Sequence, residues 1–106
     1  MKAQVFSVLF TREAKKNIDK LDPSAKKILR KAIESLASDP YRGKPLSYEL
    51  AGLRSWRTSD YRIIYRIKGR ELVILVIAVG HRKQIYKKLQ EILISLKRSS
   101  APGLSR

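Results

Sequence analysis

By its length of 106 residues, we expect this chain to form one domain with a single core and no second domain. Its 24 lysines and arginines against 9 aspartates and glutamates give a formal net charge of +15 at pH 7, which predicts polyanionic partners such as RNA, DNA, the ribosome or an acidic protein. The absence of cysteine excludes disulfides, thiol catalysis and zinc sites of the usual kind.

The first third of the chain predicts a short strand followed by two helices. Residues 5–10 are β-prone, and Thr11 then caps a first helix. Asp22 and Pro23 suit the cap and the first turn of a second helix, which ends at residues 39–40. The apolar faces consist of Ala14, Ile18 and Leu21 in the first helix, and of Ile28, Leu29, Ala32, Ile33 and Leu36 in the second. This pattern is typical of a helical hairpin packed on a sheet.

The second half of the chain predicts three strands. Residues 41–52 contain two glycines and a proline without a clean period, so we expect a loop there. The strands are expected at residues 53–58, 61–67 and 71–79, with turns at residues 59–60 and 68–70. Because residues 72–79 are apolar without alternation, the last strand is predicted to be central, with helices on one face and another element shielding the other.

A third helix is predicted after Arg82. Its apolar positions are Ile85, Leu89, Ile92, Leu93 and Leu96. Such a stripe must cover either the protein's own sheet or the groove of a partner. Residues 98–106 are predicted to be a frayed tail, which leaves a single domain over residues 1–97.

The sequence indicates neither targeting nor membrane insertion. Its N-terminus lacks the long apolar core and the cleavage site of a signal peptide. The longest apolar run, residues 72–79, is far too short to span a bilayer. We therefore expect a cytoplasmic protein without a membrane partner.

The acidic residues and the single histidine limit the chemistry available to this chain. The nine acids are scattered singly and no Gly-rich phosphate loop is present, so we expect neither a metal ion nor a cofactor. His81 is the only histidine, which excludes a paired-histidine mechanism. If this protein cleaves nucleic acid, the accessible nucleophile is the 2′-OH that RNA itself holds beside the phosphorus.

Two arginines and a tyrosine are the candidates for that chemistry. Arg62 opens one apolar strand and Arg82 lies just beyond the end of the next, so an antiparallel hairpin can bring their guanidinium groups close together around a phosphate. Tyr86 is the best candidate base, because neighbouring arginines favour the phenolate form. Arg82 is also a candidate for proton transfer.

Each candidate also has a structural interpretation. Tyr86 can cover a sheet edge, and Arg62 can belong to a solvated strand face. His81 can be a turn residue. Trp56 can stack on a nucleobase, as aromatic residues do in single-strand binding, or it can belong to the core.

Three motifs resemble a known family. They are Leu-x-Gly-Leu at residues 50–53, Arg-x-x-Asp-Tyr-Arg-Ile-Ile-Tyr at residues 57–65 and Val-Gly-His-Arg at residues 79–82, followed by Tyr86. With the order of the elements, they resemble the RelE/ParE superfamily of toxins from toxin–antitoxin pairs over residues 3–90. The resemblance implies an α+β fold, in which an N-terminal helical hairpin packs on a small antiparallel β-sheet that a C-terminal helix follows.

The resemblance also implies roles for single residues. Arg62 matches the strand arginine that contacts the scissile phosphate in RelE-like enzymes. Arg82 matches the arginine after the last strand, and Tyr86 matches a tyrosine implicated in proton transfer. These three are the predicted catalytic residues.

One feature of the RelE pattern is missing from this sequence. The expected lysine pair falls near Leu53 and Ser55, neither of which can act. A small shift of register would let Arg54 or Arg57 substitute, although a slip of one residue turns side chains to the other face. The predicted RNA-binding residues are Arg54, Trp56, Arg57, His81 and Lys83.

The resemblance leaves more than one function open. In that superfamily the RelE branch cuts mRNA in the ribosomal A site, and the ParE branch poisons DNA gyrase. We predict a ribosome-dependent mRNA endonuclease toxin, neutralised by a small acidic antitoxin whose helix or extended tail covers the basic face. The alternatives are a gyrase inhibitor without enzymatic activity, and a basic binding module that meets operator DNA only through the toxin–antitoxin complex.

Overall fold

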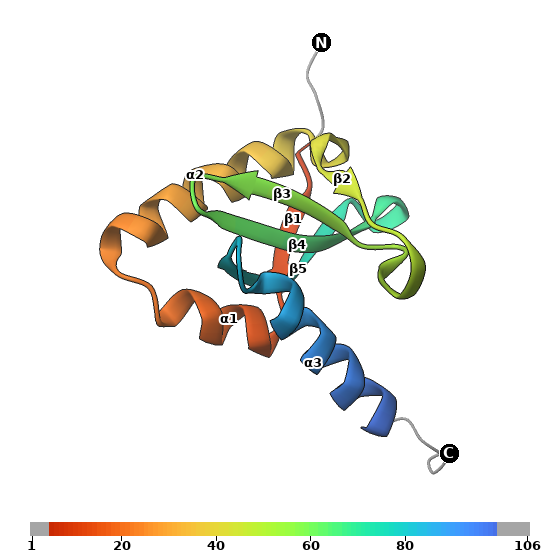
Figure 1. The fold of residues 1–106 in the computed structure, drawn as a ribbon. Helices are drawn as coiled ribbons and strands as arrows, with labels where there is room; N and C mark the ends of the chain where they lie inside the picture. Colours follow the sequence, from red (N-terminus) through yellow and green to blue (C-terminus); the bar gives the residue numbers. More distant parts are fainter. Residues whose placement is uncertain (1–4, 100–106) are drawn as a thin grey trace.

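Five strands form one sheet in the order β1-β5-β4-β3-β2, with helices on both of its faces (Figure 1). The computed structural model describes residues 5–99. The strands are β1 (Ser7–Phe10), β2 (Lys44–Pro45), β3 (Arg54–Thr58), β4 (Tyr61–Lys68) and β5 (Val73–His81). The helices are α1 (Arg12–Asp19), α2 (Pro23–Ser38) and α3 (Ile85–Ser99), and short 3-10 turns occupy Pro40–Arg42, Tyr48–Leu50 and Gly69–Glu71. This α+β architecture confirms the predicted fold class.

The helical hairpin begins where the sequence predicts, because both caps form. The Thr11 hydroxyl accepts a hydrogen bond from the Ala14 amide at 3.1 Å, and the Asp22 carboxylate accepts one from the Ala25 amide at 2.8 Å. Ile28, predicted on the apolar stripe of α2, is 36% exposed because its neighbours take the positions that face the sheet. The buried members of the core between the hairpin and the sheet are Ala14, Leu29, Ala32, Ile33, Leu36, Ala37, Ile63, Tyr65, Ile74, Val76 and Val79.

We call the side of the sheet under α1 and α2 the hairpin face, and the opposite side the α3 face. On the α3 face, Ile85 and Leu89 of α3 are fully buried against Ile64 and Ala78. The partly buried members of this second core are Leu46, Leu50, Leu53, Ile77 and Ile92. Both faces of β5 are therefore shielded, as predicted, and α3 covers the protein's own sheet.

The far end of α3 extends away from the sheet (Figure 1). Ile94 is accordingly 53% exposed. The side chain of Leu96 and residues 100–106 of the predicted tail lie outside the part of the chain that the structure describes. No helix within residues 5–99 is long and apolar enough to cross a membrane.

The sheet differs from the prediction at its two edges. β1 pairs with β5 in parallel, Ser7 opposite Val73, whereas the other strand pairs are antiparallel. Only tight turns force neighbouring strands to be antiparallel, and several intervening elements separate β1 from β5. At the other edge, the expected loop contains β2, which pairs Lys44 with Ser55. A strand of two residues has no periodicity from which it can be predicted.

A β-bulge interrupts the pairing of β4 with β5. Ile64 pairs with Ala78 but Tyr65 pairs with Val76, which leaves Ile77 as an extra residue. Ile77 and Ala78 both contribute to the core under α3, whereas Val76 and Val79 belong to the core under the hairpin. The bulge explains why Ile77 and Ala78, two consecutive residues, face the same core, while the shielding of both faces of β5 explains why residues 72–79 show no alternation.

The buried side chain of Asn17 and the half-buried side chain of Thr11 complete the hairpin face. Asn17 of α1 accepts a hydrogen bond from the Val79 amide at 2.9 Å and donates one to Glu13 at 2.8 Å. The Thr11 hydroxyl donates to the Ile77 carbonyl at 2.8 Å. Val79 and Ile77 lie beyond the last residue of β5 that pairs with β1. Thr11 and Asn17 therefore provide the hydrogen-bond partners that a neighbouring strand would otherwise supply to β5.

Tyr65 fixes the segment that leads into β2. Its hydroxyl donates to the Pro40 carbonyl at 2.7 Å and accepts from the Gly43 amide at 3.1 Å. A Cβ atom on Gly43 would lie 2.1 Å from the Tyr65 oxygen, so only glycine fits there. Desolvation by burial raises the pKa of Tyr65 above its ordinary value.

Candidate functional site

The register of the central strands sets two arginines opposite each other on the α3 face. Arg57 on β3 pairs with Arg62 on β4, and Arg62 pairs in turn with Gly80 on β5. Directly paired residues of antiparallel strands point to the same face, so both arginine side chains leave the sheet on the side of α3. Like charges in this arrangement destabilise the sheet. The pair marks a place where an anionic group is stabilising.

Arg62 and Tyr86 meet on the hydroxyl group of Ser55. Nη1 of Arg62 donates to Oγ of Ser55 at 3.0 Å, and the Tyr86 hydroxyl donates to the same oxygen at 3.3 Å. The Arg62 guanidinium carbon lies 5.9 Å from the centroid of the Tyr86 ring, within the range of a cation–π contact. Ser55 is 2% exposed and Tyr86 is 37% exposed. The cluster is therefore buried at Ser55 and accessible to solvent at Tyr86.

Close packing of α3 on the sheet places Tyr86 over this cluster. Ile85, the preceding residue, is buried beside Gly80, where an added Cβ would lie 3.1 Å from the Ile85 Cδ1. Any larger residue at Gly80 would push against the first turn of α3. The small size of Gly80 thus lets the first turn of α3, which carries Tyr86, pack close to the strand arginines.

Arg82 lies at the end of the same sheet, beside the turn between β3 and β4. Its amide donates to the Asp60 carbonyl at 2.7 Å, and its Nε lies 3.7 Å from the Asp60 carboxylate. Both side chains are exposed, 39% for Arg82 and 65% for Asp60, so this ion pair is weak. Among the described residues, no hydrogen bond joins Arg82 to Arg62 or Tyr86. Arg82 therefore stands beside the cluster with its guanidinium loosely held.

Three of the predicted RNA-binding residues, Arg54, Trp56 and His81, lie on the hairpin face of the sheet. Arg54 pairs with Tyr65 and Trp56 with Ile63, both of which belong to the hairpin core. His81 makes an edge-to-face contact with the ring of Tyr61, with centroids 6.2 Å apart. The structure does not bring these three together with Tyr86, whereas Arg57 lies on the same face as Tyr86.

The contacts of Arg54 and Trp56 are structural in kind. Arg54 donates to the carbonyl groups of Gly43 and Tyr41, at 3.2 Å each, and lies 5.4 Å from the centre of the Tyr41 ring. Arg42 lies 4.7 Å above the ring of Trp56. These contacts fasten the segment before β2 to β3. Lys83 is exposed in the turn before α3, where its amide donates to Nδ1 of His81 at 3.2 Å.

Sequence reasoning dismissed one residue of the site, Ser55, and missed another, Lys44. Lys44 pairs with Ser55 across β2 and β3, so its exposed side chain leaves the α3 face next to the cluster. It supplies a cation beside the position where the RelE pattern would place a lysine. The signal for Ser55 is its position between Leu53 and Arg57 at strand spacing, but the signal for Lys44 depends on the register of β2, which the sequence does not reveal.

The site has no acidic cluster of the kind that binds metal ions. Within residues 5–99, no group of three or more His, Cys, Asp or Glu side chains is arranged to hold a metal. The chemistry that this arrangement can perform therefore uses a phenol, guanidinium groups, an ammonium group and a hydroxyl.

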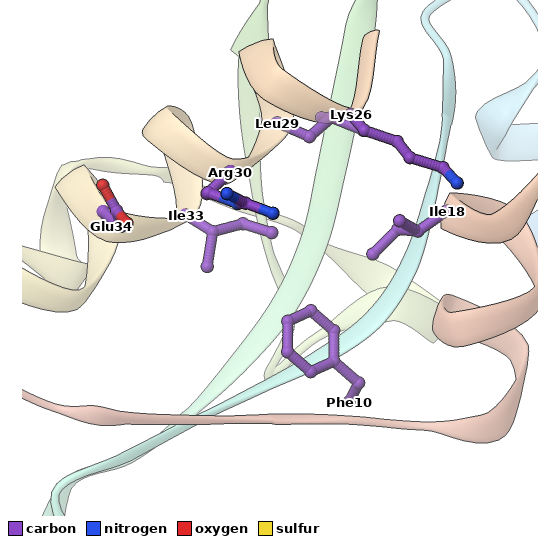
Figure 2. Close-up of a pocket in the computed structure, with 7 residues that line it drawn as sticks. All are labelled: Phe10, Ile18, Lys26, Leu29, Arg30, Ile33 and Glu34. Atoms are coloured by element: carbon purple, nitrogen blue, oxygen red, sulfur yellow. The ribbon is translucent and has the colours of Figure 1, made fainter. Parts of the chain in front are cut away.

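A second surface feature lies between β1 and the helical hairpin. A groove of about 230 Å³ lies there, lined by Phe10, Ile18, Leu29 and Ile33. Figure 2 shows that Phe10, Ile18 and Ile33 point toward a common space. Charged side chains line the groove as well, namely Lys26, Arg30 and Glu34. An apolar floor with a mainly basic rim suits an acidic amphipathic peptide.

These features define a class of protein. The family model described as ParE toxin of type II toxin–antitoxin system, parDE, matches residues 8–86. The chain belongs to this RelE/ParE superfamily of type II toxins, which confirms the resemblance detected in the motifs.

Comparison with individual proteins narrows the class. Toxin RelG of Mycobacterium tuberculosis is 38% identical over 88 residues, which cover 78% of this chain and 98% of RelG. The RelBE2 toxin–antitoxin complex from the same organism contains a chain 35% identical to this one, with a TM-score of 0.72; the match covers 76% of this chain and 95% of that one. This chain is therefore a RelE-family toxin of a toxin–antitoxin pair.

A more distant relative shares the fold alone. The intact E. coli RelBE toxin–antitoxin complex matches with a TM-score of 0.60 and 24% identity, and the match covers 72% of this chain and 95% of that one. Both of these structural relatives were solved as toxin–antitoxin complexes.

Proposed function

We propose that this protein is a ribosome-dependent mRNA endonuclease that inhibits translation, cleaves without a metal ion and is neutralised by a small acidic antitoxin. The observation that carries the proposal is the cluster of Arg62, Ser55 and Tyr86, with Arg57 opposite Arg62 on the same face. A tyrosine hydroxyl that shares a serine partner with an arginine suits proton transfer beside a phosphate. Inhibition by binding alone needs no such hydroxyl.

In the proposed reaction, the 2′-oxygen of the RNA attacks the neighbouring phosphorus, and the phenolate of Tyr86 takes the proton of that hydroxyl group. The bond from phosphorus to the 5′-oxygen breaks as the new bond forms. The 5′-oxygen leaves with a proton that Arg82 passes to it from water, so the products carry 5′-hydroxyl and 2′,3′-cyclic phosphate ends. Arg57 and Arg62 stabilise the charge that develops on the phosphorane oxygens, and Arg82 is positioned to serve the leaving group.

The remaining cations hold the RNA rather than react with it. Lys44 extends the basic surface of the α3 face, and Lys83 stands beside Arg82 in the turn before α3. Arg54, Trp56 and His81 lie on the hairpin side, so we assign them at most an outer contact with RNA or ribosome. Phosphate contacts of this kind position the strand without reading its sequence.

The groove on the hairpin face is the proposed binding site of the antitoxin. The groove between β1 and the hairpin offers an apolar floor and a mainly basic rim, and the chain as a whole carries +15 charges. A small acidic antitoxin complements both. The RelBE2 relative, solved with its antitoxin, supports this partner class. Operator DNA would then be contacted only through the toxin–antitoxin complex.

One observation favours a second candidate function. The matching family model is that of ParE toxins, and the ParE branch acts on DNA gyrase rather than on mRNA. A ParE-like inhibitor would use the basic surface for binding only.

One experiment separates the two functions. The purified protein is added to a translating extract, the 5′ ends of the mRNA are mapped, and gyrase supercoiling is measured in parallel. The endonuclease proposal expects cuts within coding regions and unimpaired supercoiling. Intact mRNA together with lost supercoiling would establish the gyrase inhibitor instead.

A further inference from the structure

Two buried polar side chains stand out in the part of the chain that the structure describes, and they have different partners. Asn17 is 4% exposed and bonds to the backbone of Val79 and to its helical neighbour Glu13, so its role is structural. Ser55 is 2% exposed, and its hydroxyl bonds to two side chains of the site, Arg62 and Tyr86. Because both side-chain partners of this buried hydroxyl belong to the site, we consider a functional role for Ser55.

The chemistry of the three groups determines what this hydroxyl can do. A guanidinium group only donates, so Arg62 must use one lone pair of the Ser55 oxygen. The second lone pair accepts from the neutral phenol of Tyr86. When the phenol has lost its proton, the serine hydrogen can turn and be donated to the phenolate. Because the cation at the other end polarises this hydroxyl, the chain from Arg62 through Ser55 to Tyr86 is strengthened in that state.

The backbone keeps Ser55 in place while this happens. It belongs to the middle of the sheet, paired with Ile64 on one side and with Lys44 on the other. Its hydroxyl can rotate but its Cα cannot move away. Arg62 and Tyr86 have long side chains that are partly exposed and would otherwise sample other positions.

We infer that Ser55 is a positioning residue for the cleavage reaction, which ties Arg62 and Tyr86 together and serves the phenol in both of its protonation states. This inference rests on the proposed endonuclease function. It assigns to Ser55 a task beyond occupying the place of the missing lysine, and it explains why a small residue is present among arginines.

The test measures cleavage of ribosome-bound mRNA by purified full-length variants. Ser55→Ala is expected to lower kcat by about 10- to 100-fold, the worth of one hydrogen bond to a charged group, with KM for the ribosome complex unchanged within about twofold. Ser55→Thr keeps the hydroxyl and is expected to retain most of kcat. Ser47→Ala is the matched control, because Ser47 is exposed and its side chain makes no capping hydrogen bond.

A double-mutant cycle shows whether Ser55 acts through Tyr86. In a Tyr86→Phe background, Ser55→Ala is expected to cost no more than about twofold further, since the group it serves is gone. An equal loss in both backgrounds, an effect on KM alone, or full activity of a folded Ser55→Ala variant would overturn the inference. If the wild-type protein leaves mRNA intact, the proposed function itself fails; if only the serine variants behave like wild type, the function stands and the role of Ser55 does not.

Discussion

The two faces of the sheet use the same residue type in opposite ways. On the hairpin face, Arg54 stacks on Tyr41 and donates to two backbone carbonyl groups, so its charge is absorbed by the protein's own contacts. On the α3 face, Arg57 and Arg62 stand directly opposite each other and make one hydrogen bond each, to the Ser59 carbonyl and to the Ser55 hydroxyl. Arg54 and Arg57 even come from the same strand, β3. The partners of an arginine, and not its presence in a basic chain, therefore distinguish a structural cation from one that can bind an anion.

The same contrast holds for the apolar side chains of the two faces. The hairpin leaves a groove open between Phe10, Ile18 and Ile33, whereas α3 closes its own core with Ile85 and Leu89. One face therefore offers hydrophobic surface to a partner, and the other offers charge. Toxicity and neutralisation are thus expected to depend on different residues.

The largest expected effect concerns the substrate of the α3 face. A ribosome-bound mRNA with a single 2′-deoxy nucleotide at the cut site should not be cleaved, because the attacking group is absent while the phosphate contacts remain. Binding should persist. Primer extension and analysis of the end groups check this, and the unmodified mRNA should yield 5′-hydroxyl and 2′,3′-cyclic phosphate ends. Cleavage of the deoxy substrate at an undiminished rate, or 5′-phosphate ends, would mean that water is the nucleophile.

The second prediction compares one arginine from each face. Arg62→Ala should lower cleavage by about two to three orders of magnitude, the range for losing one preorganised charge stabiliser. Arg62→Lys should recover little, because an ammonium group lacks the planar fork. Arg54→Ala should leave the cleavage rate nearly unchanged and lower the free energy of unfolding by about 1–3 kcal/mol, since it breaks hydrogen bonds of a charged group. Kinetics and urea unfolding of the same samples measure both; loss of cleavage by Arg54→Ala alone would reverse the assignment of the faces.

The third prediction concerns the groove. Ile18→Glu places a negative charge on its floor and should weaken binding of the acidic antitoxin by about 10- to 100-fold, from lost apolar burial of about 1.5–3 kcal/mol. Cleavage by the free toxin should be unaffected. Ile94→Glu on the exposed end of α3 is the control with the same change of charge. Calorimetric titration with the antitoxin measures both, and equal losses in the two variants would point to general repulsion rather than to the groove.

The smallest effect is on stability and its dependence on pH. Tyr65→Phe removes the partner of the Pro40 carbonyl and the Gly43 amide, which should cost about 1–3 kcal/mol at neutral pH. Burial raises the pKa of Tyr65 in the folded state, so its contribution is complete below the ordinary value of 10.0 and is lost as pH rises through the folded-state pKa. Above about pH 10, the wild type should therefore lose stability more steeply than Tyr65→Phe. Parallel unfolding curves across this range would contradict that expectation.

The sequence predicts the elements of this fold well because each has its own local signal. The caps at Thr11 and Asp22 and the helical spacing of Ile85 and Leu89 are properties of short segments. The parallel pairing of β1 is different, since it depends on where a distant strand lies. No local pattern encodes it.

The candidate site could be predicted only in part. The motifs single out Arg62 and Tyr86, which meet in the structure. The sequence analysis named Ser55 but judged it unable to act, because a serine carries no charge and its position follows only from burial and two partners. The placement of Arg54 on one face and Arg57 on the other follows from the pairing register, which depends on the tertiary structure.

The bulge at Ile77 decides which residue of β5 lies opposite Arg62. If all residues of β5 paired with β4 without a bulge, the pairing seen at Tyr65 and Val76 would continue and bring Val79 opposite Arg62, whereas the observed register brings Gly80 there. A valine in that position would occupy the space into which the first turn of α3 descends. The bulge thus brings a glycine, and not a bulky residue, to this position below α3, and deleting Ile77 would restore regular pairing while keeping Gly80 opposite Arg62.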